Sequence, residues 1–193
     1  MRPLPLITLS VLTALGFTGC ATPSKDGCNK MVVSVRDQKM LVLRDGKPLK
    51  TYKVSTSKFG IGDRPGSNCT PLGRMEVSRK IGDNLPAGTV LKHRRPTGEV
   101  VRPDAPGRDP IVSRILWLRG MEPANSHAFR RCIYIHGTAE ERSLGAPASY
   151  GCIRMSGRDV IDLYNRVGLG ADVVIIRGSL DQPQTAAPPY ASL

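Results

Sequence analysis

Apolar residues between positions 30 and 177 fall into short runs, several of them alternating with polar residues. Runs of this length, rich in Val, Ile and Leu, predict β-strands. Asp45 and Gly46 separate the second run from the third, a pattern typical of a hairpin turn. The runs predict strands at residues 30–36, 39–44, 49–55, 74–81, 111–119, 132–136 and 172–177, with shorter extended segments at 90–94 and 99–102.

One segment has the spacing of an amphipathic helix. Ser156, followed three residues later by Asp159, has the pattern of a capping box at a helix start. Apolar residues then recur at helical spacing up to Gly168, at Val160, Ile161, Leu163, Tyr164 and Val167. Residues 60–71 and 82–110 are rich in Gly, Pro and charge, which favours loops. One principal helix among about eight strands predicts a mostly-β single domain.

The start of the chain has the composition of an export signal. An uncharged apolar run from Leu4 to Phe17 is short for a membrane span and typical of a secretory signal peptide. Residues 17–20 (FTGC) resemble a bacterial lipobox, although leucine is more usual than Phe17. This indicates a signal peptide at 1–19 and acylation of Cys20, which would anchor a soluble domain to a membrane. An ordinary signal peptide with an incidental Cys20 is the alternative.

Four segments are expected: a signal peptide at 1–19, a tether at 20–29, one folded domain at 30–177 and a disordered tail at 178–193. The tether and the tail carry Pro, Ala and polar residues without periodicity. The residue after Cys20 is alanine and not the aspartate associated with inner-membrane retention. We therefore expect a periplasm-facing domain in the cell envelope, lipid-anchored to the outer membrane.

The composition is strongly basic, with 28 Lys and Arg against 16 Asp and Glu and a net charge of +12. Loss of the signal peptide would remove Arg2 alone and leave +11. Such a charge concerns partners and not the fold. An exported chain meets anionic envelope polymers, including the carboxylates of peptidoglycan stem peptides. We therefore expect those partners and no nucleic acid, with a generally basic solvated surface as the alternative.

Four cysteines remain once Cys20 is assigned to lipid: Cys28, Cys69, Cys132 and Cys152. In an oxidising compartment they could form disulfides. A reactive Cys152 would stay reduced, so one bridge among the other three is the simplest expectation, and the sequence does not choose the pair. No C-x-x-C pair occurs, and the three histidines lack ligand-like spacing. Neither a metal nor another cofactor is therefore expected.

A histidine and a cysteine lie in two neighbouring motifs. Residues 133–138 read IYIHGT and residues 149–155 read SYGCIRM, so one loop separates His136 from Cys152. Together they are the minimum for acyl transfer by a thiolate, with Cys152 as nucleophile and His136 as general base. The predicted helix starts just after Cys152, and its N-terminus would favour a thiolate. A buried structural cysteine beside a strand histidine is the alternative.

Nearby residues could supply the remaining parts of such a site. A backbone carbonyl near Gly137 could orient His136, because the sequence offers no obvious Asp or Asn partner. The N–H groups of Gly151 and Cys152 could stabilise an oxyanion, which is worth about 3 kcal/mol per donor. Arg154 could bind a substrate carboxylate through a bidentate pair, with a structural ion pair as the alternative.

Five segments together resemble the YkuD-type (ErfK/YbiS-like) L,D-transpeptidases. They are residues 136–138 (HGT), 144–145 (LG) and 149–155 (SYGCIRM), with 54–58 (VSTSK) and 70–73 (TPLG) upstream. The resemblance spans nearly the whole predicted domain. It implies a β-sandwich-like catalytic domain with a cysteine nucleophile. Such a domain takes the acyl group of a tetrapeptide stem at an L-to-D bond, releases the terminal D-alanine and passes the acyl group to an amine.

By position, the resemblance assigns the nucleophile to Cys152, the base to His136, its orienting carbonyl to Gly137 and the oxyanion hole to Gly151 with Cys152. The chain departs from the pattern at Tyr150, where the family usually has histidine. A difference in donor positioning or pKa tuning is expected there.

Two residues beside the nucleophile are expected at the substrate-binding site. A phenol can hydrogen-bond, so Tyr150 is expected to contact the substrate, with a packing aromatic as the alternative. Ser149 is expected as a turn and hydrogen-bonding residue and not as a second nucleophile.

Three functions remain open at this point. The first is a peptidoglycan L,D-transpeptidase in cell wall biogenesis, which cross-links stems or attaches an amine-bearing wall protein to them. The second is an L,D-carboxypeptidase or cross-link hydrolase, in which water is the acceptor. The third is a non-catalytic wall-binding lipoprotein, which Tyr150 favours and which an intact His136 and Cys152 oppose.

Overall fold

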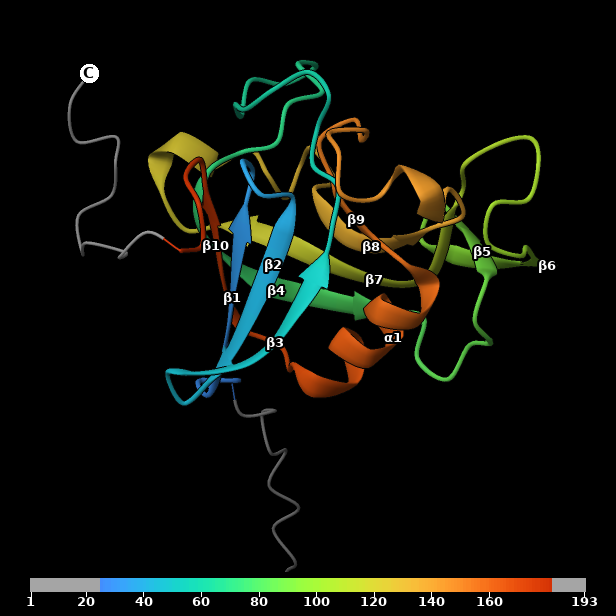
Figure 1. Ribbon diagram of the computed structural model, residues 1–193, viewed down its shortest axis with the longest axis horizontal. Helices are drawn as coiled ribbons and strands as arrows, with labels where there is room; N and C mark the ends of the chain where they lie inside the picture. The colour runs from blue at the N-terminus through green and yellow to red at the C-terminus, as the bar shows by residue number, and fades with distance from the viewer. Residues whose placement is uncertain (1–24, 182–193) are drawn as a thin grey trace, which may run out of the picture.

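The computed structural model describes residues 25–181 of the chain. Within this range there are ten strands, one α-helix and two short 3-10 helices (Figure 1). The strands are β1 (Asn29–Ser34), β2 (Lys39–Arg44), β3 (Lys47–Lys53), β4 (Gly73–Ile81), β5 (Thr89–Lys92), β6 (Arg95–Val100), β7 (Ile111–Gly120), β8 (Tyr134–Thr138), β9 (Ile153–Met155) and β10 (Asp172–Ile176). The helices are η1 (Pro123–Asn125), η2 (Glu141–Ser143) and α1 (Gly157–Arg166).

The strands form one mixed sheet in the order β3-β2-β1-β10-β4-β7-β5-β6. The sheet branches at β7, which also pairs with β8, and β8 pairs in turn with β9. Two neighbouring pairs are parallel, β1 with β10 and β8 with β9, and the other pairs are antiparallel. The β5–β6 hairpin therefore projects at the end of the molecule away from β1 and β10 (Figure 1).

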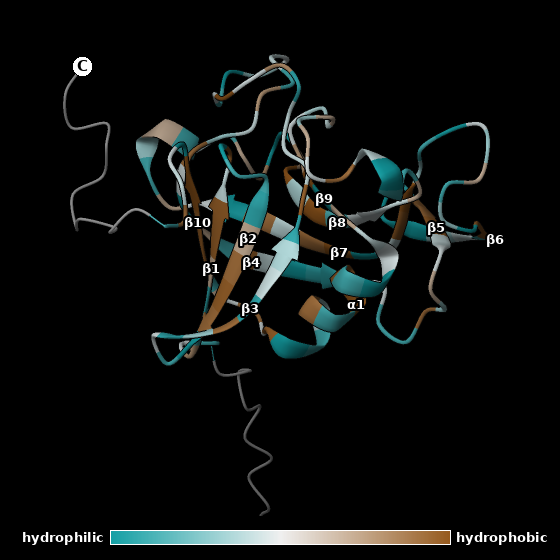
Figure 2. Ribbon diagram, in the orientation of Figure 1, coloured by the Kyte–Doolittle hydropathy of each residue, from teal (hydrophilic) through white to brown (hydrophobic). Residues whose placement is uncertain are grey.

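A single large core joins distant parts of this sheet. Buried residues of β1 and β2, such as Met31 and Met40, share it with Leu116 of β7 and Ile153 of β9. Strands from both sides of the strand order can share one core only if the sheet folds over on itself. Figure 2 shows the corresponding hydrophobic residues along β1 and β10. The mostly-β prediction with one principal helix is confirmed.

Helix α1 closes one side of the core. The Ser156 side chain accepts a hydrogen bond from the Asp159 N–H at 3.0 Å, so the helix starts with the predicted cap. Val160, Leu163 and Tyr164 are buried on its inner side, and the helix packs against β7 and β8. Its hydrophobic and hydrophilic sides are visible in Figure 2. The helix therefore supports β8, the strand that carries His136, by packing against it.

Several strand bounds differ from the sequence prediction, among them β6 at 95–100 where 99–102 was expected, and three differences have a local cause. β8 begins at Tyr134 and not at residue 132, because Cys132 has a φ of +57°, which lies outside the range of a strand. A hairpin turn at His93 and Arg94, with φ values of +50° and +65°, interrupts the predicted segment 90–94. β9 was not predicted, since three residues are too few to show an alternating pattern.

The expected disulfide is absent, because the four cysteines of residues 25–181 are all free. Cys28 and Cys132 are far apart in the sheet order: Cys28 precedes β1, Cys132 precedes β8, and β10, β4 and β7 lie between those two strands. The Cys69 thiol points to the Phe59 carbonyl oxygen at 3.1 Å.

Several predictions concern residues outside the described range. The signal peptide at 1–19, the lipidated Cys20 and most of the tail at 178–193 all fall there. Among residues 25–181, no helix has the length and apolar character needed to cross a membrane.

Candidate functional site

The parallel pairing of β8 with β9 brings the histidine and the cysteine onto one face of the sheet. His136 lies opposite Arg154, and Ile135 lies opposite Ile153. Side chains alternate between the two faces of a strand, so Tyr134 and His136 of β8 point to the same side. Cys152, just before β9, packs in one cluster with Tyr134. The side chains of Cys152, His136 and Arg154 therefore share a face.

The backbone of two residues holds the Cys152 sulfur. The thiol donates a hydrogen bond to the Cys132 carbonyl oxygen at 3.3 Å, and the Tyr134 N–H donates to the sulfur at 3.4 Å. Cys132, whose carbonyl accepts this bond, has a left-handed backbone conformation with a φ of +57°. Burial raises the pKa of the Cys152 thiol to about 11, and the Tyr134 N–H lowers it by a smaller amount. The resting residue is therefore a neutral thiol at pH 7.

A backbone carbonyl holds the imidazole of His136, on β8, in one orientation. Its Nδ1 lies 2.9 Å from the Gly137 carbonyl oxygen, an arrangement in which Nδ1 carries the proton and Nε2 is a free acceptor. The residue is 6% exposed, and burial lowers the pKa of His136 to about 4. A Cβ at position 137 would lie 2.6 Å from the Val112 carbonyl oxygen, so glycine is required there. The imidazole is consequently neutral, as a general base must be.

Ser149 organises the turn that precedes the cysteine. Its hydroxyl donates to the Cys152 carbonyl oxygen at 2.6 Å and accepts from the Gly151 N–H at 3.2 Å. Gly151 has a φ of +117°, and a Cβ there would lie 3.1 Å from the Cys69 carbonyl oxygen. This differs from the expectation that the Gly151 N–H is available to an oxyanion, because a Ser hydroxyl commonly bonds the backbone two residues on.

Tyr150 lies on the surface, with 57% of the residue exposed. The Lys58 ammonium donates to its phenol oxygen at 3.1 Å and lies 4.4 Å from its ring centroid. The Phe59 ring is 5.3 Å away. Tyr150 is thus not a core aromatic, and its ring is accessible beside the turn that carries Cys152.

Arg154 is engaged by acidic residues of this chain. Its Nη1 lies 2.9 Å from Asp109 Oδ2 and 3.7 Å from Glu140 Oε2, and its side chain is 11% exposed. Thr138 donates to the other Asp109 oxygen at 2.5 Å. The structural ion pair, which the sequence left open as the alternative, is the arrangement found. Sequence reasoning missed Asp109 because it lies in the loop between β6 and β7, which shows no periodicity.

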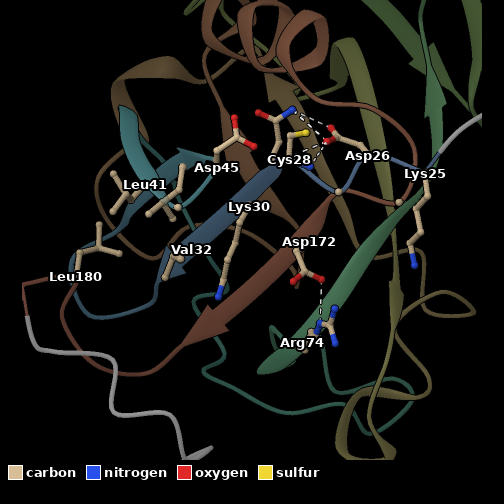
Figure 3. Close-up of a pocket in the computed structure, with 15 residues that line it drawn as sticks. Lys25, Asp26, Cys28, Lys30, Val32, Leu41, Asp45, Arg74, Asp172 and Leu180 are labelled. Atoms are coloured by element: carbon tan, nitrogen blue, oxygen red, sulfur yellow. Dashed lines mark hydrogen bonds and ion pairs between the residues drawn. The ribbon is translucent and has the colours of Figure 1, made fainter.

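A sizeable cavity lies away from these residues. It has a volume of about 860 Å³ and opens on the outer side of β1, β2 and β10 (Figure 3). Lys30, Val32 and Leu41 line it, and Arg74 and Asp172 form an ion pair at its edge at 2.9 Å. Neither Cys152 nor His136 contributes to its wall. Within residues 25–181, no group of three or more His, Cys, Asp or Glu side chains is arranged to hold a metal ion.

Solved L,D-transpeptidases share this fold. The structure from Xylanimonas cellulosilytica DSM 15894 has a TM-score of 0.51 at 18% identity, covering 80% of this chain and 63% of that chain. Mycobacterium tuberculosis L,D-transpeptidase 3, solved with a faropenem-derived adduct, has a TM-score of 0.50 at 20% identity, covering 77% and 60%. The present chain therefore spans less than two thirds of each solved chain.

Sequence comparisons agree with the structural ones. The Bacillus subtilis (strain 168) protein named "Putative L,D-transpeptidase YqjB" is 28% identical over 145 residues, which cover 75% of this chain and 69% of that protein. The family model of YkuD, the L,D-transpeptidase catalytic domain, matches residues 29–176. That match includes all ten strands and helix α1, so the chain belongs to the YkuD family of L,D-transpeptidase catalytic domains.

Proposed function

We propose that this domain is a peptidoglycan L,D-transpeptidase of cell wall biogenesis, which transfers the acyl group of a tetrapeptide stem to an amine acceptor. The observation that carries the proposal is the shared face of Cys152 and His136, with the Nδ1 of His136 fixed by the Gly137 carbonyl. That arrangement leaves Nε2 as the proton acceptor of the pair. Family membership supports an enzyme of this kind.

The chemistry begins with a neutral pair. The pKa of Cys152 is raised to about 11 and that of His136 is lowered to about 4, so the proton moves as the sulfur attacks and not before. The sulfur bonds to the stem carbonyl carbon, while Nε2 of His136 takes the thiol proton. The tetrahedral intermediate then collapses, and the imidazolium returns its proton to the departing amine of D-alanine, leaving a thioester on Cys152.

Transfer repeats these steps in the opposite direction. An acceptor amine attacks the thioester carbonyl, His136 accepts a proton from that amine, and the sulfur departs and is reprotonated. The N–H of Cys152 would donate to the oxyanion in both steps. The N–H of Gly151 would join it only by exchanging its bond to the Ser149 hydroxyl, a 3.2 Å contact.

Mass spectrometry after incubation with a carbapenem tests the nucleophile. We expect a covalent adduct on the peptide that contains Cys152, and no adduct on that peptide in Cys152→Ala. His136→Gln is expected to slow its formation by about 100-fold or more, since general base catalysis contributes that much. A protein that stays unmodified would refute both enzymatic functions and leave a wall-binding role.

The acceptor is tested separately. Muropeptide analysis of cells lacking the gene distinguishes loss of cross-links or of a wall-attached protein, which we expect, from accumulation of untrimmed stems. The second result would instead assign the hydrolase reaction, in which water attacks the same thioester.

The proposed location is the periplasmic side of the outer membrane, with Cys20 as the lipid-bearing residue. Without the signal peptide the chain has a net charge of +11, which is suited to an anionic wall polymer. Cys20→Ala is expected to move the protein from the membrane fraction to the soluble fraction. A wild-type protein found in the soluble fraction would contradict lipid anchoring.

A further inference from the structure

One arginine lies directly beside the two residues that hold the Cys152 sulfur. The Nη1 of Arg94 donates to the Tyr134 phenol oxygen at 3.3 Å and lies 3.9 Å from the Cys132 sulfur. The main chains of Tyr134 and Cys132 are the groups that bond the Cys152 thiol. Cys152 packs in one cluster with the Tyr134 and Trp117 side chains, and Arg94 contacts both of them. The Arg94 guanidinium therefore borders the cluster that holds Cys152.

Arg94 has no acidic partner among residues 25–181. Its two hydrogen bonds both use Nη1, with the Tyr134 phenol oxygen and the Cys132 sulfur as acceptors, and no carboxylate of the described residues forms an ion pair with it. This contrasts with Arg154 and Arg131, whose guanidinium groups are held by Asp109 and Asp63. The Nε and Nη2 edge of Arg94 remains available, and the residue is exposed to solvent.

The fold places this guanidinium on an aromatic platform. It lies 4.9 Å from the ring centroid of Trp117, which stacks on Phe129 at 4.3 Å with an interplanar angle of 9°. Arg94 is the second residue of the β5–β6 turn and has a φ of +65°, a conformation that non-glycine residues rarely adopt. An arginine that stacks on a ring keeps its planar edge free for a bidentate acceptor, which a lysine does not offer.

We propose that Arg94 binds a carboxylate of the acyl donor, and so determines specificity for acidic stem peptides at the site built around Cys152. The inference rests on the proposed transpeptidase function and adds the residue that recognises the charge of the donor. It gives Arg94 the role for which Arg154 was first considered, because the guanidinium of Arg154 is already paired with Asp109.

The experiment combines a residue change with a substrate change. Wild type, Arg94→Gln and the control Arg95→Gln are each assayed for release of D-alanine in the presence of a fixed concentration of an amine acceptor. The donors are a tetrapeptide stem and analogues in which one carboxylate is converted to the amide. Arg95 is an exposed neighbour on β6 with the same charge. Alkylation of Cys152 by neutral iodoacetamide, followed by mass spectrometry of that peptide, verifies an intact site in every variant.

For wild type, kcat/KM is expected to be roughly tenfold to hundredfold higher for the free-acid donor than for the analogue whose amide replaces the carboxylate bound by Arg94. Arg94→Gln should lose this preference, with no further loss on the amidated donor, and Arg95→Gln should keep it. An equal loss on both donors would assign Arg94 a structural role, and unchanged kinetics would exclude contact with the donor. If wild type releases D-alanine from neither donor while Cys152 is alkylated, the transpeptidase function itself fails, and this inference fails with it.

Discussion

The Ser149 hydroxyl donates a hydrogen bond to the Cys152 carbonyl oxygen, with 2.6 Å between the two atoms. The same hydroxyl accepts the Gly151 N–H at 3.2 Å, so a single side chain fixes both ends of the turn before the proposed nucleophile. Ser149 is 1% exposed, which shields these bonds from water. The turn is therefore set by a buried side chain and not by the glycine alone.

Replacing Ser149 with alanine leaves a buried acceptor and a buried donor without their partner. The free energy of unfolding is expected to fall by about 1–3 kcal/mol. Acylation of Cys152 by a carbapenem is expected to slow as the turn loosens. Urea denaturation and the rate of adduct formation measure the two effects.

The matched control is Ser126→Ala, which removes one exposed hydrogen bond to the Pro123 carbonyl oxygen. It should change the free energy of unfolding by less than about 0.5 kcal/mol. If Ser149→Ala is acylated at the wild-type rate, the turn does not need this side chain.

The pair formed by Asp109 and Arg154 is nearly buried, with side-chain exposures of 13% and 11%. Removing Arg154 leaves the Asp109 charge unpaired in a poorly solvated place, and removing Asp109 leaves Arg154 with only the longer 3.7 Å contact to Glu140. Asp109→Ala and Arg154→Ala are each expected to reduce the free energy of unfolding by about 3 kcal/mol. The double variant should lose less than the sum of the two, which a double-mutant cycle by urea denaturation measures.

An exposed ion pair provides the comparison. Arg108 pairs with Glu99 on the surface, with side-chain exposures of 63% and 45%. Arg108→Ala is expected to cost less than about 1 kcal/mol. Strict additivity of the Asp109 and Arg154 effects would mean that the two side chains do not interact energetically.

Local patterns in the sequence predict helix α1, but not the long-range contacts of the candidate site. Helix α1 could be predicted because Ser156 and the apolar spacing after it are local signals. The approach of His136 to Cys152 depends on β9, a strand of three residues whose pairing with β8 is not encoded locally. Asp109 reaches Arg154 from a segment without periodicity, so only the folded chain reveals that Arg154 is already paired.

His136 makes stability depend on pH. Its pKa falls from 6.5 to about 4 on folding because the imidazole is buried. Between these values the unfolded chain binds a proton that the folded chain does not, so stability declines as pH falls from 6.5 towards 4. The loss amounts to about 3 kcal/mol and then levels off.

Comparison with His136→Gln isolates this contribution, because both proteins share the same carboxyl groups. The stability advantage of wild type over the variant should shrink by about 3 kcal/mol between pH 6.5 and pH 4. Urea denaturation at intervals across this range measures it. A difference that does not vary with pH would show that the folded chain protonates His136 as readily as the unfolded one.

Tyr150 contacts Lys58 and Phe59 at the surface, so its removal should leave the core unaffected. Tyr150→Ala is expected to change the free energy of unfolding by no more than about 0.5 kcal/mol. If Tyr150 contacts the donor, KM for the stem peptide rises severalfold, while alkylation of Cys152 by iodoacetamide is unchanged. Tyr150→Phe separates the ring from the hydroxyl, and wild-type kinetics in Tyr150→Ala would limit this residue to its surface contacts.

The proton of Cys152 gives the sharpest test of the resting site. Burial raises the pKa of the thiol to about 11, so at pH 7 the sulfur is protonated. Thiolate absorbance of wild type minus that of Cys152→Ala should therefore rise only in alkaline solution, with a midpoint above pH 9. The subtraction removes the other cysteines, which the two proteins share. A thiolate already present at pH 7 would mean that His136 holds the proton at rest, and that proton transfer precedes attack instead of accompanying it.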